Sequence, residues 1–329
     1  IIMIITKTPY RISFFGGGSD YPSWYKKFGG SVLSTTIDKY IYISCRELPP
    51  FFDHKYRIVW SKIENVKTIN EIKHLTVRKL IKYNKIKSGL EIHYDGDLPA
   101  RSGMGSSSSF SVGLMRALNN HQHRDINDID LAYKTIFFEQ KIMKETVGSQ
   151  DQIAASVGGF NKINFLKNDK ILIKKILSNN LKKLNSNLLL LYTGIQRNAK
   201  TIANNYVHKL SNEKEKNIRK IILNVELGEK MIREGNINDF GKLLHDAWIE
   251  KKELSKSITN HKIDELYNIS IQNGALGGKL LGAGGGGFLL IYMMKEKQKN
   301  FLKKIKNITN IPFKFSKKGC EVILNSLKK

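Results

Sequence analysis

The most informative part of the sequence is Leu98-Pro-Ala-Arg-Ser-Gly-Met-Gly-Ser-Ser-Ser-Ser-Phe-Ser-Val-Gly-Leu-Met-Arg-Ala-Leu118. Its first half is a loop in which Gly103 and Gly105 allow tight turns. From Phe110 to Leu118 apolar residues recur at four-residue spacing, which predicts a helix with one buried face. Free backbone N–H groups and the positive end of the helix dipole meet at the serines and favour an anion such as a phosphate. The alternatives are a Ser-rich linker or an ordinary serine N-cap.

The size and charge of the chain exclude several classes of protein. Its 329 residues allow two domains or one large one, and a hydrophobic content of 41% is globular. The net charge of +26 points toward nucleic acid, but only 10 of the 55 basic residues are arginines. Arginine is the residue best suited to phosphate forks and base edges. The composition therefore favours non-specific basicity over nucleic-acid binding.

The cysteines and the apolar runs indicate the compartment. Cys45 and Cys320 are too few and too far apart for a disulfide framework or a zinc site. The apolar residues 1–5 are too short for a signal peptide, and no run of 18 apolar residues suggests a membrane span. We expect a reduced, cytoplasmic, soluble protein without a membrane partner.

Residue periodicity outlines an α+β chain. Alternating and β-branched patterns predict strands at residues 1–8, 32–45, 56–60, 90–94, 160–165, 171–176 and 188–192. Helices are predicted at residues 70–85, 128–144, over most of 199–273 and near 298–306, before a last strand near Phe313. The polar residues 178–187 predict a domain boundary.

A second glycine-rich loop lies near the start of the chain, in Pro9-Tyr-Arg-Ile-Ser-Phe-Phe-Gly-Gly-Gly-Ser-Asp-Tyr-Pro22. A strand here breaks into a triple-glycine turn whose backbone can approach a ligand closely. Asp20 places a carboxylate on that turn, and Arg11 lies nine residues upstream on the strand. The alternative is a glycine-rich hairpin in which Asp20 only caps the turn.

A third loop, Gly282-Ala-Gly-Gly-Gly-Gly287, fits the dinucleotide pattern G-x-G-x-x-G. A strand follows it instead of a helix, and no acidic residue stands at the end of a second strand, so we exclude a dehydrogenase. A Walker A motif is also excluded, because Leu280 follows Gly278 and Lys279 where serine or threonine is required. Any nucleotide must therefore bind at the serine loop.

Together the three loops resemble those of the GHMP kinases, the superfamily of galactokinase, homoserine kinase, mevalonate kinase and phosphomevalonate kinase. The matching stretches are residues 9–21, 99–108 and 279–288, in the family's order and spread over the chain. The variant Gly16-Gly-Gly-Ser-Asp-Tyr21, with Gly148-Ser-Gln-Asp-Gln-Ile-Ala-Ala155, resembles the sugar-kinase branch that acts on D-glycero-D-manno-heptose 7-phosphate. Fucose kinase domains share that branch.

The resemblance implies a two-domain α+β fold with the active site between the domains. Residues 1–185 would form the N-terminal kinase domain, of the ribosomal protein S5 domain 2-like type, with the phosphate loop. Residues 186–329 would form a ferredoxin-like C-terminal GHMP-type domain.

The implied reaction moves the γ-phosphoryl group of ATP, with Mg²⁺, to the anomeric C1 hydroxyl of the heptose 7-phosphate. The product, the 1,7-bisphosphate, would serve GDP-heptose and surface polysaccharide (capsule) biosynthesis. The expected partners are ATP and a sugar phosphate, with a homodimer left open. Another sugar such as fucose or galactose is the first alternative, and a nucleic-acid-binding protein on an S5-like fold is a remote one.

The resemblance also implies roles for single residues. Asp151 matches the catalytic aspartate that receives or orients the proton of the attacking hydroxyl, and Arg11 matches the basic residue beside the transferring group. Glu139 matches the magnesium-binding glutamate, with Ser107 as the serine ligand and Ser106 as its closest rival. Without the resemblance, Asp151 could be a helix cap and Glu139 a solvated acid.

Binding residues follow from the same loops. The predicted nucleotide-binding residues are Pro99, Arg101, Ser102, Gly103, Met104, Gly105, Ser106, Ser107, Ser108 and, as an adenine contact, Trp60. The predicted substrate-binding residues are Gly16, Gly17, Gly18, Ser19, Asp20, Tyr21, Arg197, Gly284, Gly285 and Gly286. A phosphorylated substrate needs a second anion site, for which Arg101, Lys175 and Arg197 are candidates.

Overall fold

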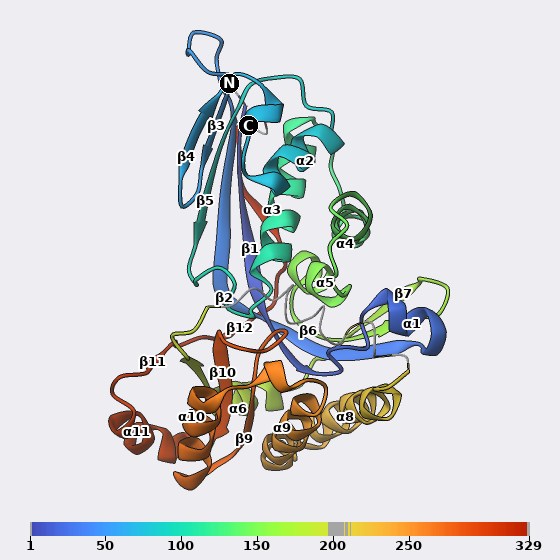
Figure 1. Ribbon diagram of the computed structural model, residues 1–329, viewed down its shortest axis with the longest axis vertical. Helices are drawn as coiled ribbons and strands as arrows, with labels where there is room; N and C mark the ends of the chain where they lie inside the picture. Colours follow the sequence, from blue (N-terminus) through green and yellow to red (C-terminus); the bar gives the residue numbers. More distant parts are fainter. Residues whose placement is uncertain (1, 197–206, 208–209, 211, 328–329) are drawn as a thin grey trace.

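The computed structural model describes residues 2–196, 207, 210 and 212–327, which form two β-sheets covered by helices (Figure 1). The strands of the first sheet are β1 (Met3–Phe15), β2 (Gly30–Glu47), β3 (Tyr56–Val59), β4 (Ile63–Val66), β5 (Leu90–Gly96), β6 (Phe160–Phe165), β7 (Ile171–Lys175), β12 (Phe315–Ser316) and β13 (Glu321–Asn325). Their order is β13-β1-β2-β5-β3-β4, while β6 and β12 also pair with β2, and β7 pairs with β6. The long strand β2 therefore joins both halves of this sheet.

The second sheet is smaller and antiparallel, in the order β11-β8-β10-β9. Its strands are β8 (Leu188–Tyr192), β9 (Ala275–Leu280), β10 (Phe288–Met293) and β11 (Thr309–Asn310). All six residues of β10 are buried, as expected for a central strand covered on both faces.

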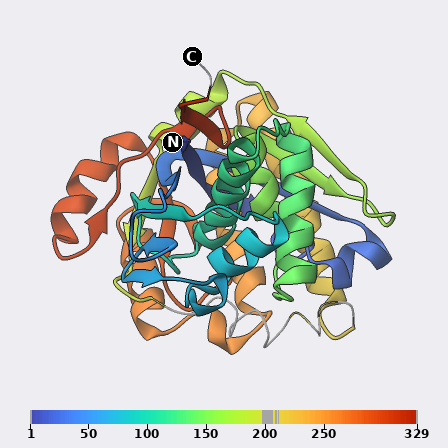
Figure 2. The same cartoon turned by 90° about the horizontal axis from the view of Figure 1, so that it is seen from above.

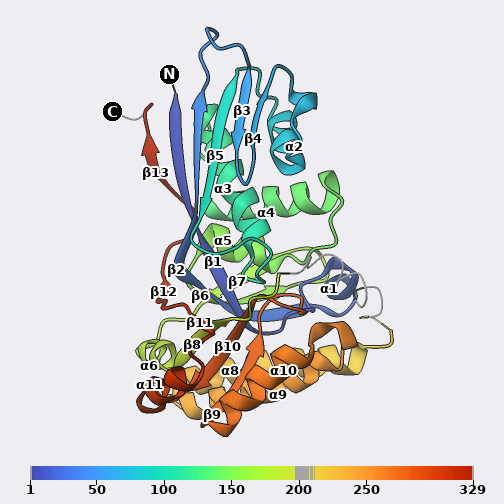
Figure 3. The ribbon, with the colours of Figure 1, turned by 60° about the vertical axis from the view of Figure 1, so that its left-hand side comes forward.

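Helices cover one face of the first sheet and pack against the second sheet (Figure 3). The α-helices are α1 (Pro22–Phe28), α2 (Leu75–Tyr83), α3 (Ser106–His121), α4 (Asp128–Phe137), α5 (Gln150–Val157), α6 (Asn180–Ser186), α8 (Glu215–Glu234), α9 (Ile237–Lys252), α10 (His261–Gln272) and α11 (Lys295–Lys304). Two 3₁₀ turns, η1 (Ile69–Glu71) and η4 (Lys256–Ile258), and one π-helix, η2 (Phe138–Ile142), complete the described elements. None of the described helices is both long enough and apolar enough to span a membrane.

Helix α3, predicted from its apolar spacing, is the central helix of the first layer. It packs on β1 and β2, and most of its residues are buried. Seen from above, α11 and the β6–β7 hairpin lie at opposite sides of the molecule (Figure 2). The two layers share one core, because the Phe14 and Phe15 rings of β1 meet the Phe240 ring of α9 at 5.3 and 5.0 Å.

Several predicted boundaries differ from the structure. The helix predicted at 128–144 is α4 followed by the π-helix, and the helix predicted at 70–85 is the shorter pair η1 and α2. The polar boundary segment 178–187 forms α6, because Leu184 supplies a buried side chain. Strands β12 and β13 lie in the predicted C-terminal domain but pair with β2 and β1 of the first sheet. The domain division between residues 185 and 186 stays a prediction, and these two strands cross it.

Candidate active site

The three glycine-rich loops meet around a cavity of about 420 Å³, a volume within the usual range for small-molecule sites. The first loop lines it with Gly16–Gly18 and Asp20, and the third loop with Gly282 and Ala283. The start of α3 lines it with Ser106–Ser108. The cavity therefore lies between the two layers.

The phosphate loop has the backbone that its glycines predict. Gly103 and Gly105 adopt φ angles of +80° and +77°, in the left-handed region where glycine is favoured. A Cβ atom on Gly103 would lie 2.4 Å from the Leu281 carbonyl oxygen of the third loop, so only glycine allows this approach. The first bond of α3 runs from the Ser109 N–H to the Gly105 carbonyl oxygen. The preceding N–H groups, those of Ser106–Ser108, therefore lie at the positive helix end and can receive an anion.

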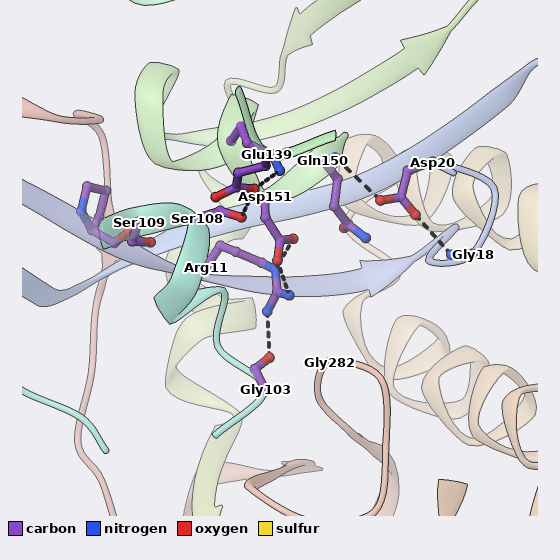
Figure 4. A network of polar contacts seen from close by, with 12 residues as sticks. Arg11, Gly18, Asp20, Gly103, Ser108, Ser109, Glu139, Gln150, Asp151 and Gly282 are labelled. Atoms are coloured by element: carbon purple, nitrogen blue, oxygen red, sulfur yellow. Dashed lines mark hydrogen bonds and ion pairs between the residues drawn. The ribbon is translucent and has the colours of Figure 1, made fainter. Parts of the chain in front are cut away.

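Arg11 and Asp151 form the central ion pair of the cavity (Figure 4). The Arg11 Nε and Nη2 atoms donate to the two Asp151 carboxylate oxygens at 2.7 and 2.8 Å. A third bond, from Nη1 to the Gly103 carbonyl oxygen at 2.6 Å, ties the pair to the phosphate loop. Arg11 is buried on β1, whereas the Asp151 side chain, at the start of α5, keeps 24% of its surface exposed toward the cavity.

Asp20 lies deeper in the same cavity and is 2% exposed. Its carboxylate accepts the Gly18 N–H at 3.0 Å and the Gln150 N–H at 3.4 Å. Burial, reinforced by the negative charge of Asp151, raises the pKa of Asp20 to about 6. The carboxylate is thus held by backbone donors but remains poorly solvated.

Glu139 is a buried carboxylate on the π-helix, beside the start of α3. Its Oε2 atom accepts the Ser108 hydroxyl at 2.9 Å and the Gln152 side-chain amide, while Oε1 has no hydrogen-bond partner among the described residues. Burial raises the pKa of Glu139 to about 7. A hard cation prefers such a carboxylate with a hydroxyl beside it, so these groups fit Mg²⁺.

The hydroxyl that contacts Glu139 belongs to Ser108, one residue beyond the predicted Ser107. All three serines, Ser106, Ser107 and Ser108, line the cavity. Ser107 is exposed, whereas Ser108 is buried. The phase of α3 decides which serine reaches Glu139, and the run of four serines carries no signal of that phase.

Two lysines in the cavity wall, the half-buried Lys251 and the buried Lys279, were not among the predicted site residues. Lys251, near the end of α9, donates to the Leu280 and Gly282 carbonyl oxygens at 2.7 and 2.6 Å. Lys279, on β9, donates to the Phe14 carbonyl oxygen at 2.6 Å. The position of Lys279 inside an apolar strand was a usable signal, whereas Lys251 stands in a lysine-rich helix and gave none.

The remaining predicted residues lie in different surroundings. The cavity lining also includes Tyr21, Arg101, Gly103 and Gly105, but not Pro99, Ser102, Met104, Ser19, Trp60, Lys175 or Gly284–Gly286. Ser19 is buried and supports the first loop by donating to the Gly16 and Ser31 carbonyl oxygens. Trp60 donates to Glu64, and Gly284 and Gly286 pack against the backbone of Ile258 and Ile195. Arg197 lies outside the described residues.

The cavity can hold phosphates at a helix N-terminus next to a carboxylate that is positioned by an arginine. Phosphoryl transfer depends mainly on positioning and charge neutralisation, which these groups supply. The site and the two-layer α+β fold are therefore those expected of a kinase that acts on a small molecule.

Comparison with known proteins identifies the family. The description "GHMP kinases N terminal domain" matches residues 69–159 and "GHMP kinases C terminal" matches residues 229–308, which together make up just over half of the chain. The chain belongs to the GHMP kinase family. It is an ATP-dependent phosphotransferase with an alcohol group as acceptor.

Relatives and solved structures support the assignment. The chain is 29% identical, over 96% of its length and 97% of the relative's, to D-glycero-alpha-D-manno-heptose 7-phosphate kinase of Campylobacter jejuni. It is 29% identical to mevalonate kinase of Methanocaldococcus jannaschii over 67% of its length and 66% of the relative's. A crystal structure described as D-glycero-D-manno-heptose 1-phosphate kinase from Bacteriodes thetaiotaomicron superposes with a TM-score of 0.80 at 21% identity, over 98% of this chain and 99% of that one. Galactokinase of Lactococcus lactis has the same fold, with a TM-score of 0.75 at 16% identity, over 97% of this chain and 95% of that one.

Proposed function

We propose that this kinase phosphorylates the anomeric C1 hydroxyl of D-glycero-D-manno-heptose 7-phosphate and releases the 1,7-bisphosphate and ADP. The observation that carries the reaction is the Arg11–Asp151 pair, which lies between the phosphate loop and Asp20. The choice of sugar is supported by the relative from Campylobacter jejuni, which is named for this substrate and matches nearly the whole chain.

In the proposed mechanism Asp151 orients the C1 hydroxyl and accepts its proton. The hydroxyl oxygen forms a bond to the γ-phosphorus of ATP as the bond from that phosphorus to the β,γ-bridging oxygen breaks. Both Asp151 oxygens accept N–H bonds from Arg11, which fix the direction of the carboxylate. The N–H groups at the start of α3 hold the phosphates of ATP.

Glu139 and Ser108, with Ser106 and Ser107 next to them, are the residues that would hold Mg²⁺. The ion would supply neutralisation of phosphate charge. Glu139 suits this role because one carboxylate oxygen has no partner in the described structure. The other oxygen is already oriented by Ser108 and Gln152.

Asp20 is proposed to accept hydrogen bonds from hydroxyl groups of the sugar. Its backbone donors fix the carboxylate in the cavity, next to the triple-glycine turn. We further propose that the enzyme is cytoplasmic and that its product feeds GDP-heptose for surface polysaccharide (capsule) biosynthesis. Light scattering would show whether the enzyme is a monomer or a homodimer.

The test is ADP release, with ATP and Mg²⁺, against heptose 7-phosphate, fucose, galactose and mannose. We expect turnover with the phosphorylated heptose and poor turnover with the free hexoses. Preference for fucose or galactose would retain the kinase mechanism and replace the substrate. Bifunctional fucokinase/GDP-fucose pyrophosphorylase of Arabidopsis thaliana is 25% identical over 88% of this chain and 30% of its own length, and this match makes fucose the first alternative.

A further inference from the structure

Two cations of the cavity wall have no role in the mechanism above. Lys251 and Lys279 both come from the second layer, one from α9 and the other from β9. Lys279 is only 7% exposed, and its ammonium group reaches across to the Phe14 carbonyl oxygen of the first sheet. Lys251 donates hydrogen bonds to the Leu280 and Gly282 carbonyl oxygens, at the start of the third loop. Both side chains line the cavity.

The charges around these lysines are unbalanced. Burial and the neighbouring Arg11 lower the pKa of Lys279 to about 7, and burial with Lys279 and Arg11 lowers that of Lys251 well below its usual value. The only acid paired with this group of cations in the described chain is Asp151, which Arg11 occupies. An anion that enters the cavity would relieve this repulsion.

The hydrogen-bonding capacity of the lysines is also incomplete. Each ammonium group has three N–H donors. Within the described residues Lys251 uses two of them and Lys279 uses one, all on backbone carbonyl oxygens. Three donors therefore remain for a ligand that carries several acceptor oxygens.

We propose that Lys251 and Lys279 form a phosphate subsite that holds the phosphomonoester group of the acceptor. The inference rests on the proposed function, because it requires an acceptor that is already phosphorylated. A heptose phosphorylated at C7 carries its charge at the end opposite C1. A site that transfers to C1 therefore needs a second anion site, separate from the phosphate loop.

Lys251 lies beside the third loop, which contacts the phosphate loop, so the choice of the acceptor over the nucleotide rests on the donors that the nucleotide already has. Ser106–Ser108 already supply donors for the phosphates of ATP on the α3 side of the cavity. Beside Lys251, the side chains of Ala247 and Leu254 give the wall an apolar surface that suits a carbon chain. Of the three residues predicted for a second anion site, Arg101 lies in the cavity wall, Lys175 does not, and Arg197 lies outside the described residues.

The experiment compares heptose 7-phosphate with unphosphorylated heptose in the wild type and in Lys251→Met and Lys279→Met. We expect each variant to lower kcat/KM for the phosphorylated acceptor by about 10- to 100-fold, the value of one charge-assisted hydrogen bond. The value for unphosphorylated heptose should stay within about twofold, and KM for ATP should not change. Lys251→Arg should recover part of the loss.

Lys242→Met is the matched control, because Lys242 lies on the same helix but is exposed and pairs with Asp239. It should change neither acceptor. If the methionine variants fail to fold, inorganic phosphate tests the subsite in the wild type. It should compete with heptose 7-phosphate and not with ATP.

Three results would overturn the inference. Equal losses of kcat/KM for both acceptors would give the lysines a structural role. A raised KM for ATP, or phosphate that competes only with ATP, would assign the lysines to nucleotide binding. In both cases the proposed function stands. A wild type that prefers unphosphorylated heptose would overturn the proposed function and the subsite together.

Discussion

Asp151 and Arg11 depend on each other at the scale of single residues. The guanidinium group is buried on β1 and would be unpaired without the carboxylate, while the carboxylate is aimed by two of its N–H groups. A buried charge that loses its partner is costly, so function and local stability are coupled at this pair. Function and stability are also coupled at Asp20, because burial disfavours the negative charge that its proposed role in sugar binding requires.

Asp151→Asn should lower kcat by about 10²–10⁴-fold, because the amide cannot accept the proton of the hydroxyl. The Kd for ATP, measured by calorimetry, should stay within about threefold. Asp169→Asn, which alters an exposed carboxylate paired with Lys26, is the control and should retain full activity. Near-normal turnover of Asp151→Asn would remove the residue from the role of base.

Asp20 predicts a pH dependence of stability. Because its folded pKa of about 6 lies above the ordinary value of 3.8, its favourable contribution is complete below pH 3.8 and is lost as the pH rises through 6. Asp20→Asn should therefore gain stability over the wild type on the order of 1–2 kcal/mol at pH 7, after a discount for weaker backbone hydrogen bonds.

Urea unfolding at pH 4 and pH 7 measures this difference, which should be small at pH 4. Asp239→Asn, at an exposed position, should show no such dependence. A variant less stable than the wild type at both pH values would contradict the assignment. The same variant should bind the sugar acceptor poorly while it retains ATP.

At the scale of elements, the contact between the phosphate loop and the third loop fixes the cavity. Gly103 and Gly282 face each other so closely that a Cβ atom on either would lie within 2.5 Å of the opposite loop. The N-terminus of α3 is thereby held against the second sheet. Glycine is required here by proximity as well as by backbone conformation.

Gly103→Ala should lower the free energy of unfolding by about 3 kcal/mol and reduce turnover, because strain and a backbone clash add. Gly194→Ala is the matched control, since Gly194 has a φ of +71° but its Cβ would meet nothing closer than 3.7 Å. That variant should lose only about 1 kcal/mol. Chemical denaturation of both variants measures the difference, and equal losses would show that the clash is relieved without cost.

At the scale of the whole molecule, a charged cluster joins α8 to the first sheet. Glu229 of α8 pairs with Lys162 of β6 at 3.1 Å, with Lys174 of β7 at 2.8 Å and with Arg233 at 2.9 Å. Burial alone would raise the pKa of Glu229, but hydrogen bonds from Lys174, Lys162 and Arg233 lower it to about 2. The cluster lies outside the cavity lining and holds the two layers together.

Glu229→Gln should lower the free energy of unfolding by about 2 kcal/mol at pH 7, because the nearly buried Lys162 loses an ion-pair partner. Since the folded pKa lies below the ordinary 4.5, the contribution of Glu229 is present above pH 4.5 and disappears as the pH falls toward 2. Glu234→Gln, at an exposed pair on the same helix, should change stability by less than about 0.5 kcal/mol. Equal effects of the two variants would show that the cluster does not join the layers.

Much of the fold was predictable because many of its helices, strands and loops depend on short stretches of sequence. Apolar spacing after the serines predicted α3, β-branched and aromatic residues predicted β2, and short alternating or apolar runs predicted β5, β6 and β8. Glycine runs marked the loops that surround the cavity. Glycine at positions 103 and 105 permits the positive φ angles that the phosphate loop adopts. The resemblance to the family rested on the same local stretches, and the comparisons confirmed it.

Local sequence patterns were thus enough to predict most of the strands and helices, the three loops and the family, because each depends on residues close together in the chain. Long-range packing was needed to bring Ser108 against Glu139, to pair β13 with β1, and to place Lys251 and Lys279 in the same cavity wall as Arg11. These features depend on helix phase and on contacts between residues more than 20 positions apart. A lysine in a lysine-rich chain gains its meaning from burial and neighbouring charge, which arise only when the two layers close around the cavity.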